Sequence, residues 1–214
     1  MPMSGVHNYH LKPTRFAARL SLALGITKDS IVTNSNDSVT LRLMTEHDLA
    51  MLYEWLNRSH IVEWWGGEEA RPTLLTYRTV LAKRFSARVR HSIHCNAEWR
   101  ADWVCPVVRC SWKRGRMVGR RNRSRVRGID QSLANASQLG KGLGTKLVRA
   151  LVELLFNDPE VTKIQTDPSP SNLRAIRCYE KAGFEKQGTV TTPDGPAVYM
   201  VQTRRAFERT RSDA

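Results

Sequence analysis

The chain has 214 residues, of which 41% are hydrophobic, and it carries a net charge of +14. This length fits one domain with a sizeable core, and no apolar run is long enough to span a bilayer, so we expect a soluble protein of the cytoplasm. The four cysteines, Cys95, Cys105, Cys110 and Cys178, follow no pairing pattern, which argues against a disulfide-stapled secreted domain.

Almost all of the excess positive charge lies in one basic segment, residues 74–125. It holds 14 Lys and Arg residues against only Glu98 and Asp102, a net charge of +12. The segment has no clear strand alternation, so we expect an irregular middle part of the chain. Its charge and its tryptophans would suit single-stranded nucleic acid, which makes a basic nucleic-acid-binding protein one alternative. Because the rest of the chain is nearly neutral, we do not favour nucleic acid as the partner.

The N-terminal part is expected to be a leader and linker, residues 1–35, without fixed structure, followed by a single domain over residues 36–214. Val39 to Met44 alternate as a strand. Thr45 to Asp48 then resemble a capping box, with Asp in place of Glu, before a helix over Leu49 to Leu56.

Two adjacent tryptophans, followed by two glycines, come shortly after that helix. Glu63, Glu68 and Glu69 lie around them, so Trp64 and Glu63 are candidates for a lip that stacks on sugar rings and binds cations. An equally good interpretation is that one tryptophan anchors the core and the acidic side chains are simply solvated.

Three glycines at alternate positions, Gly140, Gly142 and Gly144, stand directly before an apolar run with helical spacing. Glycine lets the backbone turn tightly, and a helix N-terminus presents free N–H groups to an anion. The spacing fits neither the dinucleotide fingerprint nor the P-loop. The pattern therefore predicts a turn that holds an anionic cofactor.

The remaining elements are predicted on both sides of this helix. The stretch from Val126 to Leu133 leads into the glycine loop and contains a strand end at Gly128-Ile129-Asp130, which carries a carboxylate next to the expected cofactor. A second strand from Val161 to Thr166 closes on Asp167. A helix between Pro170 and Phe184 begins at a Ser171 cap and ends at Gly183. Residues 184–191 and 197–203 form a hairpin, and residues 204–214 are a charged tail.

Two of these blocks resemble the GNAT acetyltransferase superfamily. Leu139 to Thr145, Leu-Gly-Lys-Gly-Leu-Gly-Thr, is similar to its acetyl-CoA pyrophosphate loop, with Leu139 at the usual Arg/Gln position and Gln138 one residue earlier. Asn172 to Phe184 is similar to its Asn-x-x-Ala-x-x-x-Tyr-x-Lys-x-Gly-Phe block.

The resemblance implies an α/β (α+β) fold, with a central mixed, mostly antiparallel sheet flanked by helices. It implies acetyl-CoA as cosubstrate, no metal, and these cofactor-binding residues: Ile129, Gln138, Gly140, Lys141, Gly142, Leu143, Gly144, Thr145 and Asn172.

Residues 30–73 and 126–214 look more closely like the aminoglycoside 6'-N-acetyltransferases of antibiotic resistance. That resemblance implies a monomer or homodimer that acetylates the 6'-amine, with Asp130 as general base and Tyr179 as the acid at sulfur. Glu63, Trp64, Asp130 and Asp167 would bind the polycationic substrate. An enzyme of the same fold that acts on another amine is the alternative.

Residues 74–125 do not match that family. We interpret this segment as the related gene translated in a shifted reading frame between two compensating frame slips. The reason is that Arg, Cys and Trp are all more frequent there, whereas acidic residues are almost absent. The chain as written is then expected to keep the acetyl-CoA half of the site and to acetylate aminoglycosides poorly or not at all.

Overall fold

The computed structural model describes residues 32–33, 39–43, 49–64, 67, 92–97, 107–109, 125–192 and 194–212. The elements before the glycine loop are β1 (Val32–Thr33), β2 (Val39–Leu43), α2 (Leu49–Leu56), α3 (Ser59–Val62), β3 (Ser92–Ala97), β4 (Val107–Arg109), β5 (Val126–Gly128) and the 3-10 turn η3 (Ala136–Gln138). After it come α5 (Leu143–Phe156), β6 (Lys163–Thr166), α6 (Leu173–Lys181), β7 (Glu185–Thr192), β8 (Gly195–Thr203) and α7 (Arg204–Ser212).

The strands form two four-stranded sheets. The first has the order β1-β2-β3-β4 and is antiparallel throughout. The second has the order β5-β6-β8-β7 and is mixed, because β5 and β6 run parallel while the other pairs are antiparallel. A mixed, mostly antiparallel arrangement flanked by helices is the fold class predicted from the sequence. Within the described part of the chain, none of the helices is long and apolar enough to cross a membrane.

Two parts of the first sheet lie where the sequence did not predict strands. β3 and β4 belong to the basic segment, yet β3 pairs with the whole length of β2 and β4 pairs with β3. β1 lies within residues 1–35, so the sheet begins before the boundary expected at residue 36. The division into leader and domain stays a prediction.

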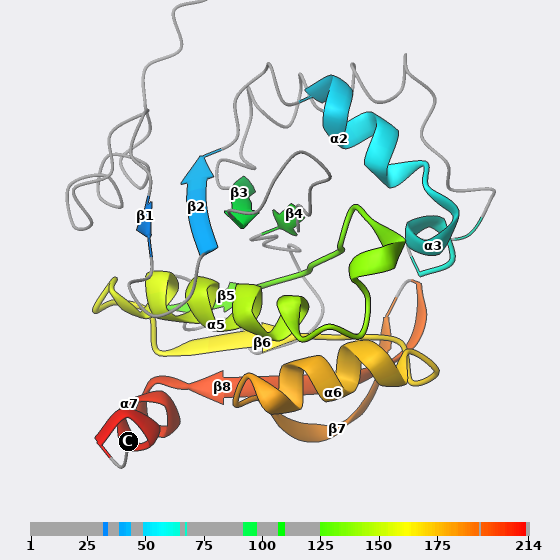
Figure 1. Ribbon diagram of the computed structural model, residues 1–214. Coiled ribbons are helices and arrows are strands. Elements are labelled where there is room, and N and C mark those ends of the chain that lie inside the picture. Colours follow the sequence, from blue (N-terminus) through cyan, green and yellow to red (C-terminus); the bar gives the residue numbers. More distant parts are fainter. Residues whose placement is uncertain are drawn as a thin grey trace, which may run out of the picture.

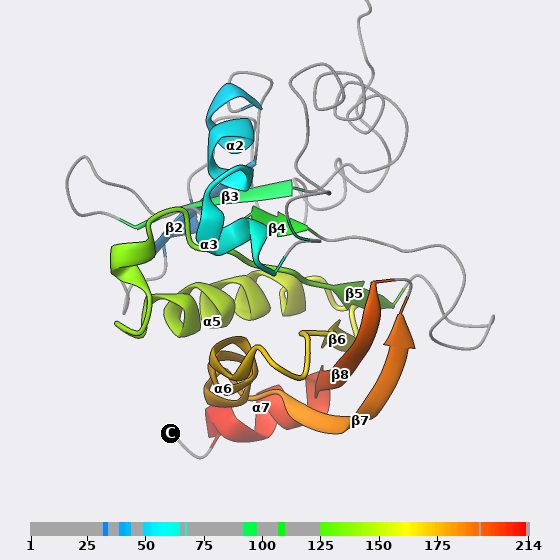
Figure 2. The same cartoon turned by 90° about the vertical axis from the view of Figure 1, so that its right-hand side faces the viewer.

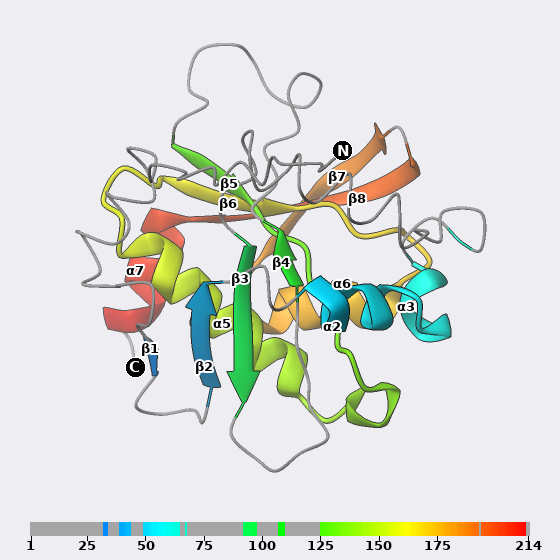
Figure 3. The same cartoon turned by 90° about the horizontal axis from the view of Figure 1, so that it is seen from above.

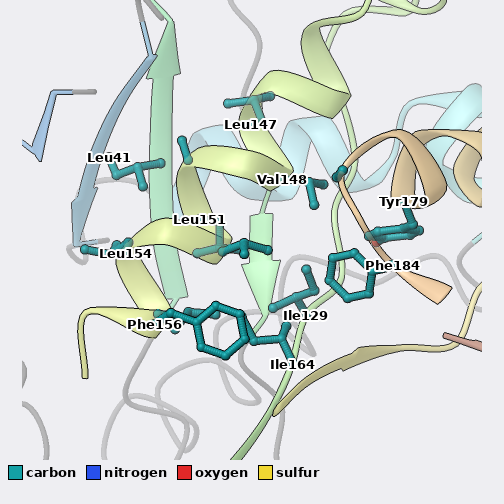
Figure 4. Close-up of a cluster of buried hydrophobic side chains, with 14 of the residues drawn as sticks. Leu41, Ile129, Leu147, Val148, Leu151, Leu154, Phe156, Ile164, Tyr179 and Phe184 are labelled. Carbon is teal, nitrogen blue, oxygen red and sulfur yellow. The ribbon is translucent and has the colours of Figure 1, made fainter. Parts of the chain in front are cut away.

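The core is organised around α5, which has apolar residues on more than one face. Leu147 and Leu151 are each only 1% exposed, and Val148 and Val152 are equally enclosed. Figure 1 shows α5 between β2 above it and β6 and α6 below it, and Figure 3 shows β2 and β3 crossing over α5. In Figure 4, Leu41 of β2 packs from the side of the first sheet, and Ile129 and Ile164 pack from the side of the second. One helix therefore joins the two sheets into one core.

Most element boundaries agree closely with the sequence-based predictions. The helix expected over Leu49 to Leu56 is α2 with those bounds, and the predicted hairpin is β7 and β8. The strand expected from Val39 is β2, whereas the capping box at Thr45 to Asp48 lies outside the described residues.

The cap of α6 and the C-terminal tail differ from the predictions. Asn172, not Ser171, caps α6, because its side-chain oxygen accepts from the N–H of Ala175 at 3.0 Å. The charged tail is a helix, α7, which packs Phe207 against Phe156 with ring centroids 5.0 Å apart. Arg204 fixes its start by donating to the carbonyl oxygens of Val161 and Asp158.

The central role of α5 predicts that Leu151→Ala will destabilise the protein by about 2–5 kcal/mol, since it removes a fully enclosed side chain at the meeting point of both sheets. Arg149→Ala on the exposed face of the same helix should cost less than about 1 kcal/mol, although it removes a hydrogen bond to the Lys181 carbonyl oxygen. Urea unfolding followed by circular dichroism measures both. Equal losses would show that α5 does not organise the core.

Candidate active site

The glycine loop turns into α5 without any side-chain cap. Gly140 has φ 78° and Gly142 has φ 81°, both in the left-handed region that favours glycine, and Gly142 is the N-cap residue of α5. No side chain bonds the first N–H groups of the helix, and those groups have no partner within it. A Cβ at Gly140 or Gly142 would meet nothing within 4 Å. The two glycines therefore serve the turn and leave open space in front of the helix N-terminus, as an anion-binding loop requires.

Gly144 has a different reason to be glycine. A Cβ there would lie 3.3 Å from Sγ of Cys178, so α5 and α6 touch at this point. The same sulfur accepts from Nε2 of Gln131 at 3.1 Å and from Oγ1 of Thr145 at 3.6 Å. Burial raises the pKa of the Cys178 thiol, so the thiol stays neutral and packs between helices. This cluster ties the start of α5 to α6 and to the segment that follows β5.

A cavity of about 380 Å³ opens at this junction. It lies between the glycine loop, the face of α6, the segment after β5 and the end of α3. The α3 wall is fixed to that segment by His60, whose Nε2 lies 2.8 Å from the Leu133 carbonyl oxygen, and by Arg58, which donates to the Ala134 carbonyl oxygen at 2.8 Å. Its lining residues are His60, Ile61, Trp64, Gln131, Ser132, Leu133, Leu139, Gly140, Gly142, Gly144, Thr145, Asn172, Arg174, Ala175, Arg177, Cys178 and Lys181.

The predicted catalytic residues Asp130 and Tyr179 lie near each other. Tyr179 is only 3% exposed, and burial raises the pKa of its hydroxyl, with further contributions from the charges of Asp130 and Asp167. A hydrogen bond with the Thr166 side chain opposes these effects on the pKa. Asp130 and Asp167 follow the parallel strands β5 and β6, whose ends meet at one edge of the sheet. Tyr179 is not among the residues that line the cavity, although its neighbour Cys178 is.

The predicted cofactor-binding residues divide into two groups. Gly140, Gly142, Gly144, Thr145 and Asn172 line the cavity. The other four do not. The N–H of Ile129 donates to the Gln165 carbonyl oxygen at 2.9 Å, and its side chain belongs to the core. Leu143 packs on the same core, Lys141 is exposed, and Gln138 belongs to η3. Since the N–H of Ile129 is engaged within the sheet, donors for a bound carbonyl group must come from farther along the chain.

The two candidates for the substrate lip differ in position. Trp64 is 37% exposed and lines the cavity from the end of α3. Glu63 ends the same helix, is exposed, and does not line the cavity. Glu68 and Glu69 lie outside the described residues.

Several lining residues were not predicted from the sequence. Gln131 is a polar residue in a connecting segment and gave no signal there. Arg174, Arg177 and Lys181 stand at helical spacing in the second block, and that spacing is the signal that marks them as one face. Among the described residues there is no group of three or more His, Cys, Asp or Glu side chains arranged to hold a metal ion.

Comparison with known proteins identifies the family of the chain. Residues 44–192 match the family described as an acetyltransferase (GNAT) domain. The chain belongs to the GNAT acetyltransferases. This membership confirms the fold class and the acetyltransferase chemistry predicted from the two sequence blocks.

Individual GNAT relatives are very similar to the chain. It is 72% identical over 200 residues to "Aminoglycoside N(6')-acetyltransferase type 1" of Klebsiella pneumoniae, which covers 89% of this chain and 96% of that protein. It is 88% identical over 102 residues to a "Kanamycin resistance protein" of Rhizobium radiobacter, covering 48% of this chain and 94% of that one. The solved structure of the aminoglycoside acetyltransferase AAC(6')-Ib with coenzyme A and kanamycin has a TM-score of 0.66 and 65% identity, covering 81% of this chain and 99% of that chain.

The loop geometry predicts that Gly142→Val will weaken acetyl-CoA binding about tenfold or more, which corresponds to about 1.4 kcal/mol. A β-branched residue is strained at φ 81°, and its side chain would occupy the space in front of the α5 N-terminus. Isothermal titration measures the affinity.

Gly188→Val is the matched control, because Gly188 also has a positive φ and open space around it but lies in β7. The control should lose stability and keep its affinity for acetyl-CoA. An unchanged affinity in the Gly142 variant would remove the loop from cofactor binding.

Proposed function

We propose that the protein transfers the acetyl group of acetyl-CoA to the 6'-amine of aminoglycoside antibiotics and thereby confers resistance. The observation that carries the proposal is the meeting of two unlike groups of residues. The glycine loop opens on a cavity, and two carboxylates at the adjacent strand ends lie near the buried Tyr179 of α6. The identity of 72% to an enzyme named for this reaction supports the choice of acceptor.

The glycine loop is the part of the chain that fits the cosubstrate. Acetyl-CoA, when bound, supplies the acetyl thioester. Gly140, Gly142 and Thr145 line the cavity in front of the α5 N-terminus, where free N–H groups would hold the diphosphate. Asn172 lines the same cavity, but its side-chain oxygen is engaged by the N–H of Ala175, so only the rest of its amide is free to meet the cofactor.

Asp130 and Tyr179 would have complementary roles in proton transfer. The acceptor amine must lose a proton before it attacks, and Asp130 would accept that proton directly or through water. Tyr179 holds its own proton at neutral pH, since burial and the charges of Asp130 and Asp167 raise the pKa of its hydroxyl. A neutral hydroxyl donates a hydrogen bond, so it would stabilise the leaving sulfur.

The acceptor side combines negative charge with an aromatic wall. Asp130 and Asp167 would attract a polycationic substrate, and Trp64 would stack on one of its sugar rings from the end of α3. Glu63 is exposed near Trp64 and would add charge at the entrance. Because acetyl-CoA is made inside cells, we also propose that the protein acts in the cytoplasm, as a monomer or homodimer.

Residues 74–125 affect the expectation of poor acetylation in two ways. They were expected to be irregular, whereas β3 and β4 complete the first sheet from within that segment. Their net charge of +12 would still repel a polycation, which slows the encounter with substrate more than the chemical step. We therefore expect a raised KM for aminoglycosides that falls as salt screens the repulsion.

Thiol release from acetyl-CoA in the presence of kanamycin tests the function. Acetylated product at the 6'-amine, identified by mass spectrometry and NMR, is the expected result. Spermidine and a lysine peptide serve as other amines in parallel. Turnover with those amines and none with kanamycin would favour the alternative enzyme of the same fold. DNA binding that weakens steeply with salt, in a protein without turnover, would favour the alternative of a nucleic-acid-binding protein.

The buried hydroxyl predicts that Tyr179→Phe will leave the affinity for acetyl-CoA unchanged and lower kcat by about 10²-fold or more, since general acid–base groups typically contribute that much. Tyr199→Phe is the matched control, because its hydroxyl also makes hydrogen bonds, with Gln165 and Lys163, in the same sheet. The control should keep its kcat. Equal rates for both variants would show that Tyr179 is a structural core residue only.

A further inference from the structure

Three cations form a row along one face of α6. Arg174, Arg177 and Lys181 stand three and four residues apart, which puts them above one another on a helix. All three are exposed and line the cavity that the glycine loop opens on. Figure 1 shows α6 running beside α5, with the loop before α5 near the ends at which both helices begin, and Figure 2 shows the same order of α6 below α5.

These cations have no acidic partner among the residues that the structure describes. Some other cations do, since the half-buried Arg58 pairs with Glu54 at 2.7 Å and the exposed Lys186 pairs with Glu180 at 2.8 Å. Like charges at helical spacing repel each other and destabilise the helix slightly. A row of this kind beside a cavity becomes favourable when an anion occupies the space in front of it.

The chemistry of coenzyme A identifies the anion. Its diphosphate is matched by the N–H groups at the α5 N-terminus, which leaves the phosphate on the ribose 3'-oxygen without a partner. A phosphate monoester carries close to two negative charges at neutral pH, and arginine binds such a group through two parallel N–H donors. The acceptor can be excluded, because a polycation would be repelled by this face.

We propose that Arg174, Arg177 and Lys181 form a subsite for the ribose 3'-phosphate, so that the enzyme selects coenzyme A over its 3'-dephospho form. The proposal rests on acetyl-CoA being the cosubstrate. In this proposal the two walls of the cavity bind different phosphates of coenzyme A. The glycine loop binds the diphosphate through its backbone N–H groups, and α6 binds the ribose 3'-phosphate through its side chains.

Binding of CoA and of 3'-dephospho-CoA to the full-length protein, measured by isothermal titration, tests the subsite. The unsubstituted protein should bind CoA about tenfold more tightly than dephospho-CoA. Each of Arg174→Gln, Arg177→Gln and Lys181→Gln should lower the affinity for CoA about two- to fivefold, and the triple variant about tenfold or more. The affinity for dephospho-CoA should change by less than about twofold.

Two further variants make the result specific. Arg209→Gln removes an exposed cation from α7 and should leave both affinities unchanged. Arg177→Lys keeps the charge and should recover part of the loss seen with glutamine. Thermal melting of every variant should agree with that of the parent, because the substituted side chains are exposed.

The outcomes separate this inference from the proposed function. Equal affinities for CoA and dephospho-CoA in a protein that acetylates kanamycin would overturn the subsite and leave the function intact. An equal loss for both ligands in the triple variant would also overturn it, since the row would then act on the diphosphate. A protein that binds neither ligand would contradict the subsite and the proposed function together.

Discussion

The close approach of α5 to α6 at Gly144 is the contact on which the site depends. A Cβ at Gly144 would lie 3.3 Å from the sulfur of Cys178, so any larger residue there would push α5 and α6 apart by a few tenths of an ångström. Gln131 and Thr145 hydrogen-bond to the same atom, so the contact also includes the segment after β5. As a result, the glycine loop, the cation row of α6 and the segment after β5 face one cavity, which the end of α3 closes on its fourth side.

The charges around this cavity are sorted by sign. Positive groups, namely the α5 N-terminus and the α6 cations, gather where an anionic cofactor would enter. Negative groups, Asp130 and Asp167, lie at the strand ends, close enough to raise the pKa of Tyr179. The substrates proposed here have opposite charges, so the same field that attracts each to its own side repels it from the other. The field would therefore orient both substrates before either makes a specific contact.

How much of this could be predicted from the sequence depends on how local the signal is. The glycine loop, α5, the second block and the hairpin are each specified by neighbouring residues, and all were predicted correctly. The close contact of Gly144 with Cys178 could not be predicted, since it joins residues far apart in sequence.

The cap of α6 was assigned one residue early, because Ser171 and Asn172 are both good N-cap residues and only the backbone conformation decides between them. The α7 helix was missed because charged residues carry little pattern, and what holds it is the packing of Phe207 on Phe156 and the bonds of Arg204.

The strands in the basic segment show why side-chain pattern is an incomplete guide to a sheet. Pairing of β2 with β3 runs through backbone N–H and C=O groups, which every residue except proline supplies in full, so a segment without alternation can still complete a ladder. What alternation adds is the burial of one face. Two side chains of the first sheet show what that burial contributes. Val39 and Leu41 of β2 belong to the same core as the buried residues of α5. A disturbance of the first sheet would therefore reach α5 through these two side chains.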